Sequence, residues 1–196
     1  MNLANKLTLM RVILVVFFLF FIYIDIPYHF LFALIVFAGA SITDALDGHI
    51  ARKNNLITNF GKFLDPLADK VLVMAALAVF VEIDEVSMSA IPLIIIISRE
   101  FMVSGLRLFA ANSGVVAAAG MWGKLKTAFT MITIIGILAW LVFVYDFSGF
   151  NLNLGDNFYN ISEICISSMI WISTLLTIIS GVLYLKSYWH FIDVDK

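Results

Sequence analysis

The sequence predicts an all-α polytopic membrane protein with six transmembrane helices and with its N- and C-termini cytoplasmic. Composition is the first reason. Hydrophobic residues make up 62% of the 196 positions and charged residues 13%, whereas soluble domains average about 45–50% and about 25%. The second reason is that the apolar residues occur in runs near the length of about 20 residues that crosses a bilayer as a helix. The third is the placement of Lys and Arg between these runs.

Six apolar runs are the expected spans, and they cover roughly 9–24, 30–50, 63–81, 88–108, 125–145 and 164–186. The first is expected to remain as a signal anchor, because no small-residue cleavage site follows it. The polar stretch from Asp146 to Glu163 is rich in Asn and Gly and is expected to form an external loop. No linker divides the chain, so residues 1–196 are expected to form a single membrane domain.

The basic residues predict the orientation in the membrane. If the N-terminus is inside, every Lys and Arg falls on or near the cytoplasmic side of the six spans, and the opposite loops contain acids but no bases. This segregation follows the positive-inside rule for membrane proteins. It predicts an integral protein of the inner or plasma membrane. The acids of the opposite loops are Asp25, Glu82, Asp84, Glu85, Asp146, Asp156 and Glu163.

Four aspartates interrupt the apolar pattern between residues 44 and 69. The first two are three positions apart and the last two are four apart, so each pair occupies one face of a helix. A short turn around residues 53–55 would bring the two faces together, on the cytoplasmic side of the second and third spans. Pro66 predicts a kink or a new helix start beside them. With the glycines on the same faces, the set is Asp44, Asp47, Gly48, Gly61, Asp65 and Asp69.

These carboxylates are typical of a divalent metal site. An uncompensated Asp at the centre of a membrane helix costs about 2.5–3.5 kcal/mol, and carboxylates close together also repel each other. Ligand sets made only of oxygens suit Mg²⁺ or Mn²⁺. Arg52 can bind phosphate oxygens with two hydrogen bonds, and Gly48 and Gly61 leave space for a phosphate. The alternative is a set of solvated acids at helix ends, which makes the matching helical phases a coincidence.

The pattern Asp44-x2-Asp47-Gly48-x2-Ala51-Arg52-x8-Gly61-x3-Asp65-x3-Asp69 resembles the complete signature of the CDP-alcohol phosphatidyltransferases. These membrane enzymes displace CMP from a CDP-linked lipid with an alcohol. The resemblance implies two divalent metals, Mg²⁺ or Mn²⁺, held by Asp44, Asp47, Asp65 and Asp69. It also implies that Asp69 is the general base, that the cytidine diphosphate contacts Gly48, Arg52 and Gly61, and that the chain forms a homodimer.

Basic residues follow in two further stretches. Arg99 and Arg107 are eight positions apart near the end of the fourth span, which is about 80° around a helix, so both can face one pocket. Lys124, Lys126 and Thr127 stand at the start of the fifth span. Snorkelling of helix-end bases accounts for Lys124 and Lys126 without a binding role, but it does not account for Arg99, which follows four isoleucines and a serine. An anion site is the alternative.

These segments, with the N-terminal Asn5, Thr8 and Arg11, resemble the family members that form phosphatidylglycerol phosphate from CDP-diacylglycerol and sn-glycerol 3-phosphate. The resemblance implies that the acceptor phosphate binds Arg99, Arg107, Lys124, Lys126 and Thr127, and that the N-terminal residues close the cytoplasmic rim. Ala4 and Thr130 depart from the pattern, which has proline and glutamine there. Two other interpretations stay open: another acceptor, such as serine or inositol phosphate, or a divalent-cation transporter.

Overall fold

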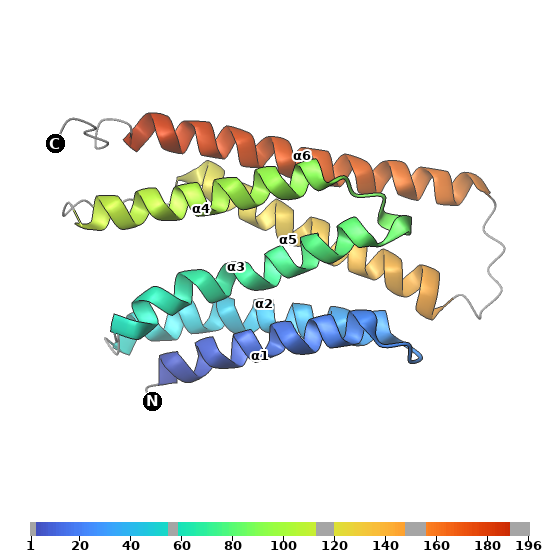
Figure 1. Cartoon of the computed structure of the whole chain (residues 1–196), viewed down its shortest axis with the longest axis horizontal. Helices are drawn as coiled ribbons and strands as arrows, with labels where there is room; N and C mark the ends of the chain where they lie inside the picture. The colour runs from blue at the N-terminus through green and yellow to red at the C-terminus, as the bar shows by residue number, and fades with distance from the viewer. Residues whose placement is uncertain (1–2, 55–58, 113–119, 148–155, 189–196) are drawn as a thin grey trace. The chain divides into compact units, whose positions relative to one another are not determined.

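The computed structural model describes residues 3–54, 59–112, 120–147 and 156–188, and it describes side chains within 9–43, 70–110, 120–147 and 157–188. The described part of the chain is helical and contains no strand, which confirms the all-α prediction for these residues (Figure 1). The α-helices are α1 (Leu3–Tyr23), α2 (His29–Asn54), α3 (Asn59–Glu82), α4 (Ala90–Asn112), α5 (Met121–Leu141) and α6 (Asp156–Tyr188). A short 3₁₀ helix, η1 (Asp84–Val86), precedes α4, and a π-helix, η2 (Val142–Asp146), continues α5.

Each predicted apolar run therefore corresponds to one α-helix. Two continuous helical stretches are long and apolar enough to cross a membrane among the residues described: Met121–Asp146 and Asn157–Tyr188. Two shorter apolar helical stretches are Leu9–Tyr23 and His29–Thr43. The number of spans and the side on which the termini lie stay predictions.

Three predicted boundaries are wrong. Helix α2 continues through Lys53 and Asn54, so the turn does not begin at residue 53. Helix α6 begins at Asp156 rather than near 164, so the second half of the predicted external loop is its first two turns. Helix α3 begins at Asn59 rather than near 63 and runs through Pro66, so of the two outcomes predicted at this proline the new helix start is excluded. In an apolar setting a helix pairs nearly all backbone polar groups within one segment, and it tolerates the one bond that a proline removes.

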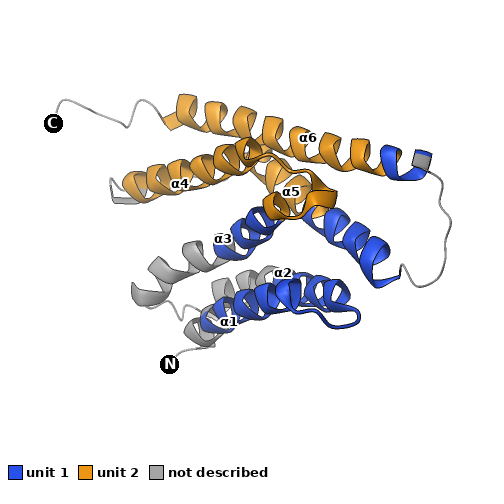
Figure 2. Cartoon of the chain, turned by 45° about the vertical axis from the view of Figure 1, so that its right-hand side comes forward, with its two compact units in different colours: residues 1–79, 134–160 blue, residues 80–133, 161–196 orange. Residues whose placement is uncertain are grey.

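The described chain forms two compact units, Met1–Val79 with Ile134–Asn160 and Phe80–Thr133 with Ile161–Lys196 (Figure 2). In the first unit, α1 packs on α2 through apolar residues at helical spacing. Phe18 and Phe37 are both fully buried, and their ring centroids are 5.8 Å apart. Asp146 of η2 accepts a hydrogen bond of 2.8 Å from the Leu31 N–H. This bond pairs one of the free amides at the start of α2 with a negative charge.

In the second unit, α4 and α6 run in the same direction. Two hydrogen bonds join them, and the later residue of α4 pairs with the later residue of α6. Arg99 donates to Ser180 over 2.6 Å, and Arg107 donates to Tyr184 over 3.1 Å. The order of these pairs requires a parallel arrangement of the two helices.

Helix α5 runs opposite to α6. Near its start, a Cβ atom on Gly123 would lie 3.8 Å from the Ser180 hydroxyl, and further along Thr130 and Ser173 share a hydrogen bond of 2.8 Å between their hydroxyl groups. The earlier residue of α5 thus contacts the later residue of α6, which requires an antiparallel arrangement of the two helices. All three side chains are almost fully buried, with exposed fractions of 2% for Thr130, 2% for Ser173 and 3% for Ser180.

Candidate active site

The aspartate signature lies on α2 and α3. Asp44 and Asp47 fall within α2, and Asp65 and Asp69 fall within α3, so the helical backbone that their spacing requires is present in both stretches. Their side chains lie outside those described, as do the side chains of Asn5, Thr8, Gly48, Arg52 and Gly61. As a donor set, four carboxylates supply the hard oxygen ligands that Mg²⁺ and Mn²⁺ prefer. No group of three or more His, Cys, Asp or Glu side chains that could hold a metal occurs among the described residues.

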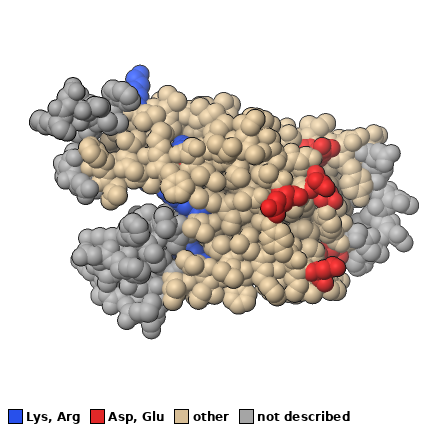
Figure 3. Space-filling model, in the orientation of Figure 1, with Lys and Arg blue, Asp and Glu red and all other residues tan. Residues whose placement is uncertain are grey.

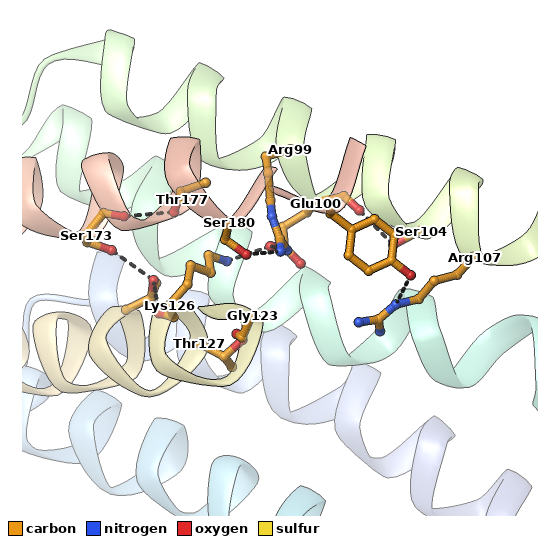
Figure 4. A network of polar contacts seen from close by, with 12 residues as sticks. Arg99, Glu100, Ser104, Arg107, Gly123, Lys126, Thr127, Ser173, Thr177 and Ser180 are labelled. Carbon is orange, nitrogen blue, oxygen red and sulfur yellow. Dashed lines mark hydrogen bonds and ion pairs between the residues drawn. The ribbon is translucent and has the colours of Figure 1, made fainter. Parts of the chain in front are cut away.

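The structure brings two predicted binding residues of the second unit together at a glutamate (Figure 4). Arg99 donates to Oε1 of Glu100 over 3.0 Å, and the Lys126 ammonium donates to the same oxygen over 2.5 Å. The exposed fractions of the side chains are 10% for Arg99, 4% for Lys126 and 17% for Glu100. Two buried cations thus share one carboxylate, and a net positive charge remains.

Arg99 is enclosed on several sides. Its second terminal nitrogen donates to Ser180, and its buried Nε has no hydrogen-bond partner. A Cβ atom on Gly181 would lie only 3.1 Å from Cγ of Arg99, which is closer than side chains normally pack, so a glycine at this position leaves room for the arginine. An Arg with an unpaired, buried N–H is a candidate for binding an anion, because an unpaired buried donor carries a desolvation cost.

Arg107 is exposed and is held by α6. Its Nε donates to the Tyr184 hydroxyl, and its guanidinium carbon lies 5.4 Å from the centroid of the Tyr184 ring. That ring in turn stacks on Tyr188 with centroids 4.6 Å apart. The arginine therefore has both a hydrogen bond and a cation–π contact to one tyrosine.

The other predicted binding residues have different surroundings. Lys124 and Thr127 are exposed on the first turns of α5, and the Thr127 hydroxyl donates to the Gly123 carbonyl over 3.0 Å. Arg11, on α1 in the first unit, is buried with 9% exposed. Of the predicted acceptor residues, Arg99 and Lys126 share a partner, Glu100.

Charges of opposite sign lie at opposite ends of the second unit, apart from Glu100, which lies among the bases. The acids stand before α4 and near the start of α6, and the bases stand from the middle to the end of α4, at the start of α5 and at the end of α6 (Figure 3). With α4 and α6 parallel and α5 reversed, this places the two groups apart. The acids are Glu82, Asp84, Glu85 and Glu163, and the bases are Arg99, Arg107, Lys124, Lys126 and Lys186.

A single match to a known protein family covers both the aspartate signature and the basic residues of α4 and α5. The family model described as CDP-alcohol phosphatidyltransferase matches residues 1–179.

The chain belongs to the CDP-alcohol phosphatidyltransferase family.

Three curated relatives carry the name CDP-diacylglycerol–glycerol-3-phosphate 3-phosphatidyltransferase. The protein of Bacillus subtilis is 40% identical, with 96% of this chain and 96% of the relative covered. That of Haemophilus influenzae is 38% identical, with 94% and 92% covered. That of Rickettsia bellii is 38% identical, with 95% and 94% covered.

In this CDP-alcohol phosphatidyltransferase, Ser180 and Tyr184 of α6 contact the two arginines, and neither residue is predicted from the sequence to belong to the site. The sixth predicted span is recognised only as an apolar run, and no residue of it is among the predicted binding residues. The match to the family model ends at residue 179, immediately before Ser180. One signal was present. The small polar residues Ser173, Thr177 and Ser180 recur at steps of four and three in an apolar helix, which indicates a buried polar face.

Proposed function

We propose that the chain transfers the phosphatidyl group of CDP-diacylglycerol to sn-glycerol 3-phosphate, releasing CMP and forming phosphatidylglycerol phosphate. The observation that carries the proposal is the similarity, over more than nine-tenths of both chains, to relatives named for this reaction. The cationic residues of the second unit support an acceptor that bears a phosphate, because charged hydrogen bonds from Arg and Lys are the usual way to bind one.

The acceptor phosphate binds Arg99, Arg107, Lys124 and Lys126, with Thr127 adding a hydroxyl. Glu100 offsets only one of the two buried cations, so an anion of the acceptor can supply the missing charge. Serine carries no net charge and leaves this excess without a partner. Inositol phosphate carries a phosphate and is therefore the stronger rival acceptor.

The chemistry at phosphorus depends on the aspartates of α2 and α3. Asp44, Asp47, Asp65 and Asp69 would hold two Mg²⁺ or Mn²⁺ ions, and these ions would neutralise charge on the diphosphate and on the departing CMP. Asp69 accepts the proton of the glycerol hydroxyl as that oxygen forms a bond to the lipid-bearing phosphorus. The bond from this phosphorus to the CMP oxygen breaks, and CMP leaves with the electron pair. Gly48, Arg52 and Gly61 contact the cytidine diphosphate, and Asn5, Thr8 and Arg11 close the rim.

The same proposal includes the placement in the cell. The chain forms one membrane domain of six spans with the aspartates on the cytoplasmic side, where nucleotides and Mg²⁺ are available. The separation of acids from bases in the second unit supports this orientation. A homodimer is proposed from the family resemblance alone.

An acceptor assay tests the proposal. The purified full chain, reconstituted in liposomes with CDP-diacylglycerol, is given sn-glycerol 3-phosphate, inositol phosphate or serine, and the release of CMP is measured. We expect CMP release with sn-glycerol 3-phosphate and Mg²⁺ or Mn²⁺, and none after chelation of the metal. Faster release with either of the other acceptors contradicts the proposed substrate.

A further inference from the structure

Helix α6 contacts both arginines of α4 through residues on one of its faces. Ser180 and Tyr184 are one helical turn apart, and each accepts a hydrogen bond from a different arginine. Gly181, beside Ser180, leaves the space that the Arg99 side chain occupies. Three positions within about one turn of α6 thus either bond to an arginine of α4 or leave room for one.

These contacts differ from ordinary packing in an apolar helix. Ser180 has an exposed fraction of 3% and Tyr184 of 8%, so both residues are almost fully buried in the protein. Among the other buried hydroxyls of α6, Thr174 donates to the Ile170 carbonyl and Thr177 to the Ser173 carbonyl of the same helix, while Ser173 shares a hydrogen bond with the neutral Thr130 hydroxyl of α5. At Ser180 and Tyr184, the hydroxyl oxygens instead accept from cations of another helix.

The orientation of Arg99 depends on few contacts. Its Nε has no partner, and its terminal nitrogens donate to Glu100 and Ser180. Glu100 follows Arg99 on the same helix, so Ser180 of α6 is the direct hydrogen-bond partner of the guanidinium on another helix. Arg107 is exposed, and its described contacts are both to Tyr184. Without these partners, each arginine would have to be ordered when the phosphate binds, which weakens binding.

We propose that Ser180 and Tyr184 of α6 are positioning residues that hold Arg99 and Arg107 in place for the acceptor phosphate, with Gly181 providing space for Arg99. This inference rests on the proposed function, which assigns the two arginines to the acceptor. It adds a role for the C-terminal part of α6, beyond the residues matched by the family model. The hydroxyls act through the arginines and do not themselves take part in the reaction.

Paired variants of the reconstituted full chain test the inference. Ser180→Ala and Tyr184→Phe each remove one accepting hydroxyl. We expect each to raise the KM for sn-glycerol 3-phosphate by about five- to twentyfold, which corresponds to the loss of a hydrogen bond of about 1–1.8 kcal/mol. The KM for CDP-diacylglycerol should stay within about twofold of the original, because neither substitution alters a residue that contacts the lipid substrate in the proposal. Ser180→Thr, which keeps a hydroxyl, should recover most of the lost affinity.

Matched controls lie on the same helix. Ser187→Ala removes an exposed hydroxyl that donates to the Leu183 carbonyl, and Tyr188→Phe removes the hydroxyl of the ring stacked on Tyr184. Both should leave the acceptor KM unchanged. If Ser180→Ala and Tyr184→Phe behave like these controls, or if they change both KM values and kcat together, the positioning role is wrong.

A second measurement separates this inference from the proposed reaction. Inorganic phosphate is titrated into each protein without lipid substrate, and the shift in melting temperature is recorded. Phosphate should stabilise the unaltered chain and both controls more than Ser180→Ala and Tyr184→Phe. Equal shifts in all proteins overturn the positioning role. If the shifts differ as expected but the unaltered chain releases no CMP with sn-glycerol 3-phosphate, the proposed acceptor is wrong and the positioning role stands.

Discussion

Glu100 accepts hydrogen bonds from two buried cations at one carboxylate oxygen, although its neighbourhood in the sequence suggests only a local partner for Arg99. Its contact to Lys126 joins α4 to α5 across 26 positions of the chain. Removing one member of a buried charge cluster leaves the others uncompensated, which is more costly than the net value of the intact cluster. Glu100 is therefore a stabilising residue of the unit and also limits its positive charge.

Glu100→Gln should destabilise the protein. Loss of the shared charge leaves Arg99 and Lys126 to repel each other, and we expect a cost of up to about 3–5 kcal/mol in the free energy of unfolding. Thermal unfolding in detergent measures it, with Glu163→Gln as a control at an exposed acid of α6. Added inorganic phosphate should restore part of the loss. An unchanged melting temperature would show that the ion pairs contribute nothing.

Asp69 is the proposed base, and its replacement should separate binding from chemistry. Asp69→Asn keeps the size of the side chain but cannot accept the hydroxyl proton, so turnover should fall by about 10²- to 10⁴-fold. Binding of CDP-diacylglycerol, measured by titration in detergent, should remain largely intact. Asp84→Asn, at an acid outside the signature, is the control. Unchanged turnover in Asp69→Asn removes Asp69 from the base role.

At the scale of helices, the sequence correctly predicts that each apolar run forms an α-helix, because long runs of this composition have few alternatives to a helix. Ends are predicted less well. Apolarity marks where a helix lies in the membrane, while α2 and α6 extend into polar sequence that hydropathy does not register. The contacts of Ser180 and Tyr184 could not be predicted, because nothing in the sequence of α6 indicates which helix its polar face meets. The aspartate positions depend on a local helical period, which is readable from the sequence.

The contact of α5 with α6 includes the buried hydrogen bond between Thr130 and Ser173. Thr130 stands where the family resemblance leads us to expect glutamine. Thr130→Val keeps the shape but leaves the Ser173 hydroxyl without this partner, so we expect a loss of about 0.6–1.7 kcal/mol in stability, the range for such bonds between membrane helices. Thermal unfolding measures the loss.

Thr133→Val is the matched control for this bond. It removes a hydroxyl of α5 that is equally buried but donates to the Phe129 carbonyl of its own helix. A loss in Thr130→Val no larger than that in Thr133→Val would show that the bond between the helices is not a stabilising contact.

For the whole molecule, the decisive question is which side of the membrane the bases face. In the proposed reaction the aspartate site uses Mg²⁺ or Mn²⁺, a nucleotide-linked substrate and a charged acceptor, and the proposal takes all three from the cytoplasm. The exposed residues Glu163 and Lys186 of α6 report on this orientation from a single helix. They are about 35 Å apart along an ideal helix, slightly more than the hydrocarbon core of about 30 Å.

Cysteine labelling tests this topology. In a Cys165→Ser background, which removes the chain's one native cysteine, Glu163→Cys or Lys186→Cys is treated in intact cells with a maleimide that does not cross membranes. The positive-inside rule predicts labelling of Glu163→Cys from outside, and of Lys186→Cys only in inverted vesicles. The reverse pattern would place the bases outside the cell, away from the cytoplasmic substrates. It would contradict the proposed reaction even if every helix were correctly assigned.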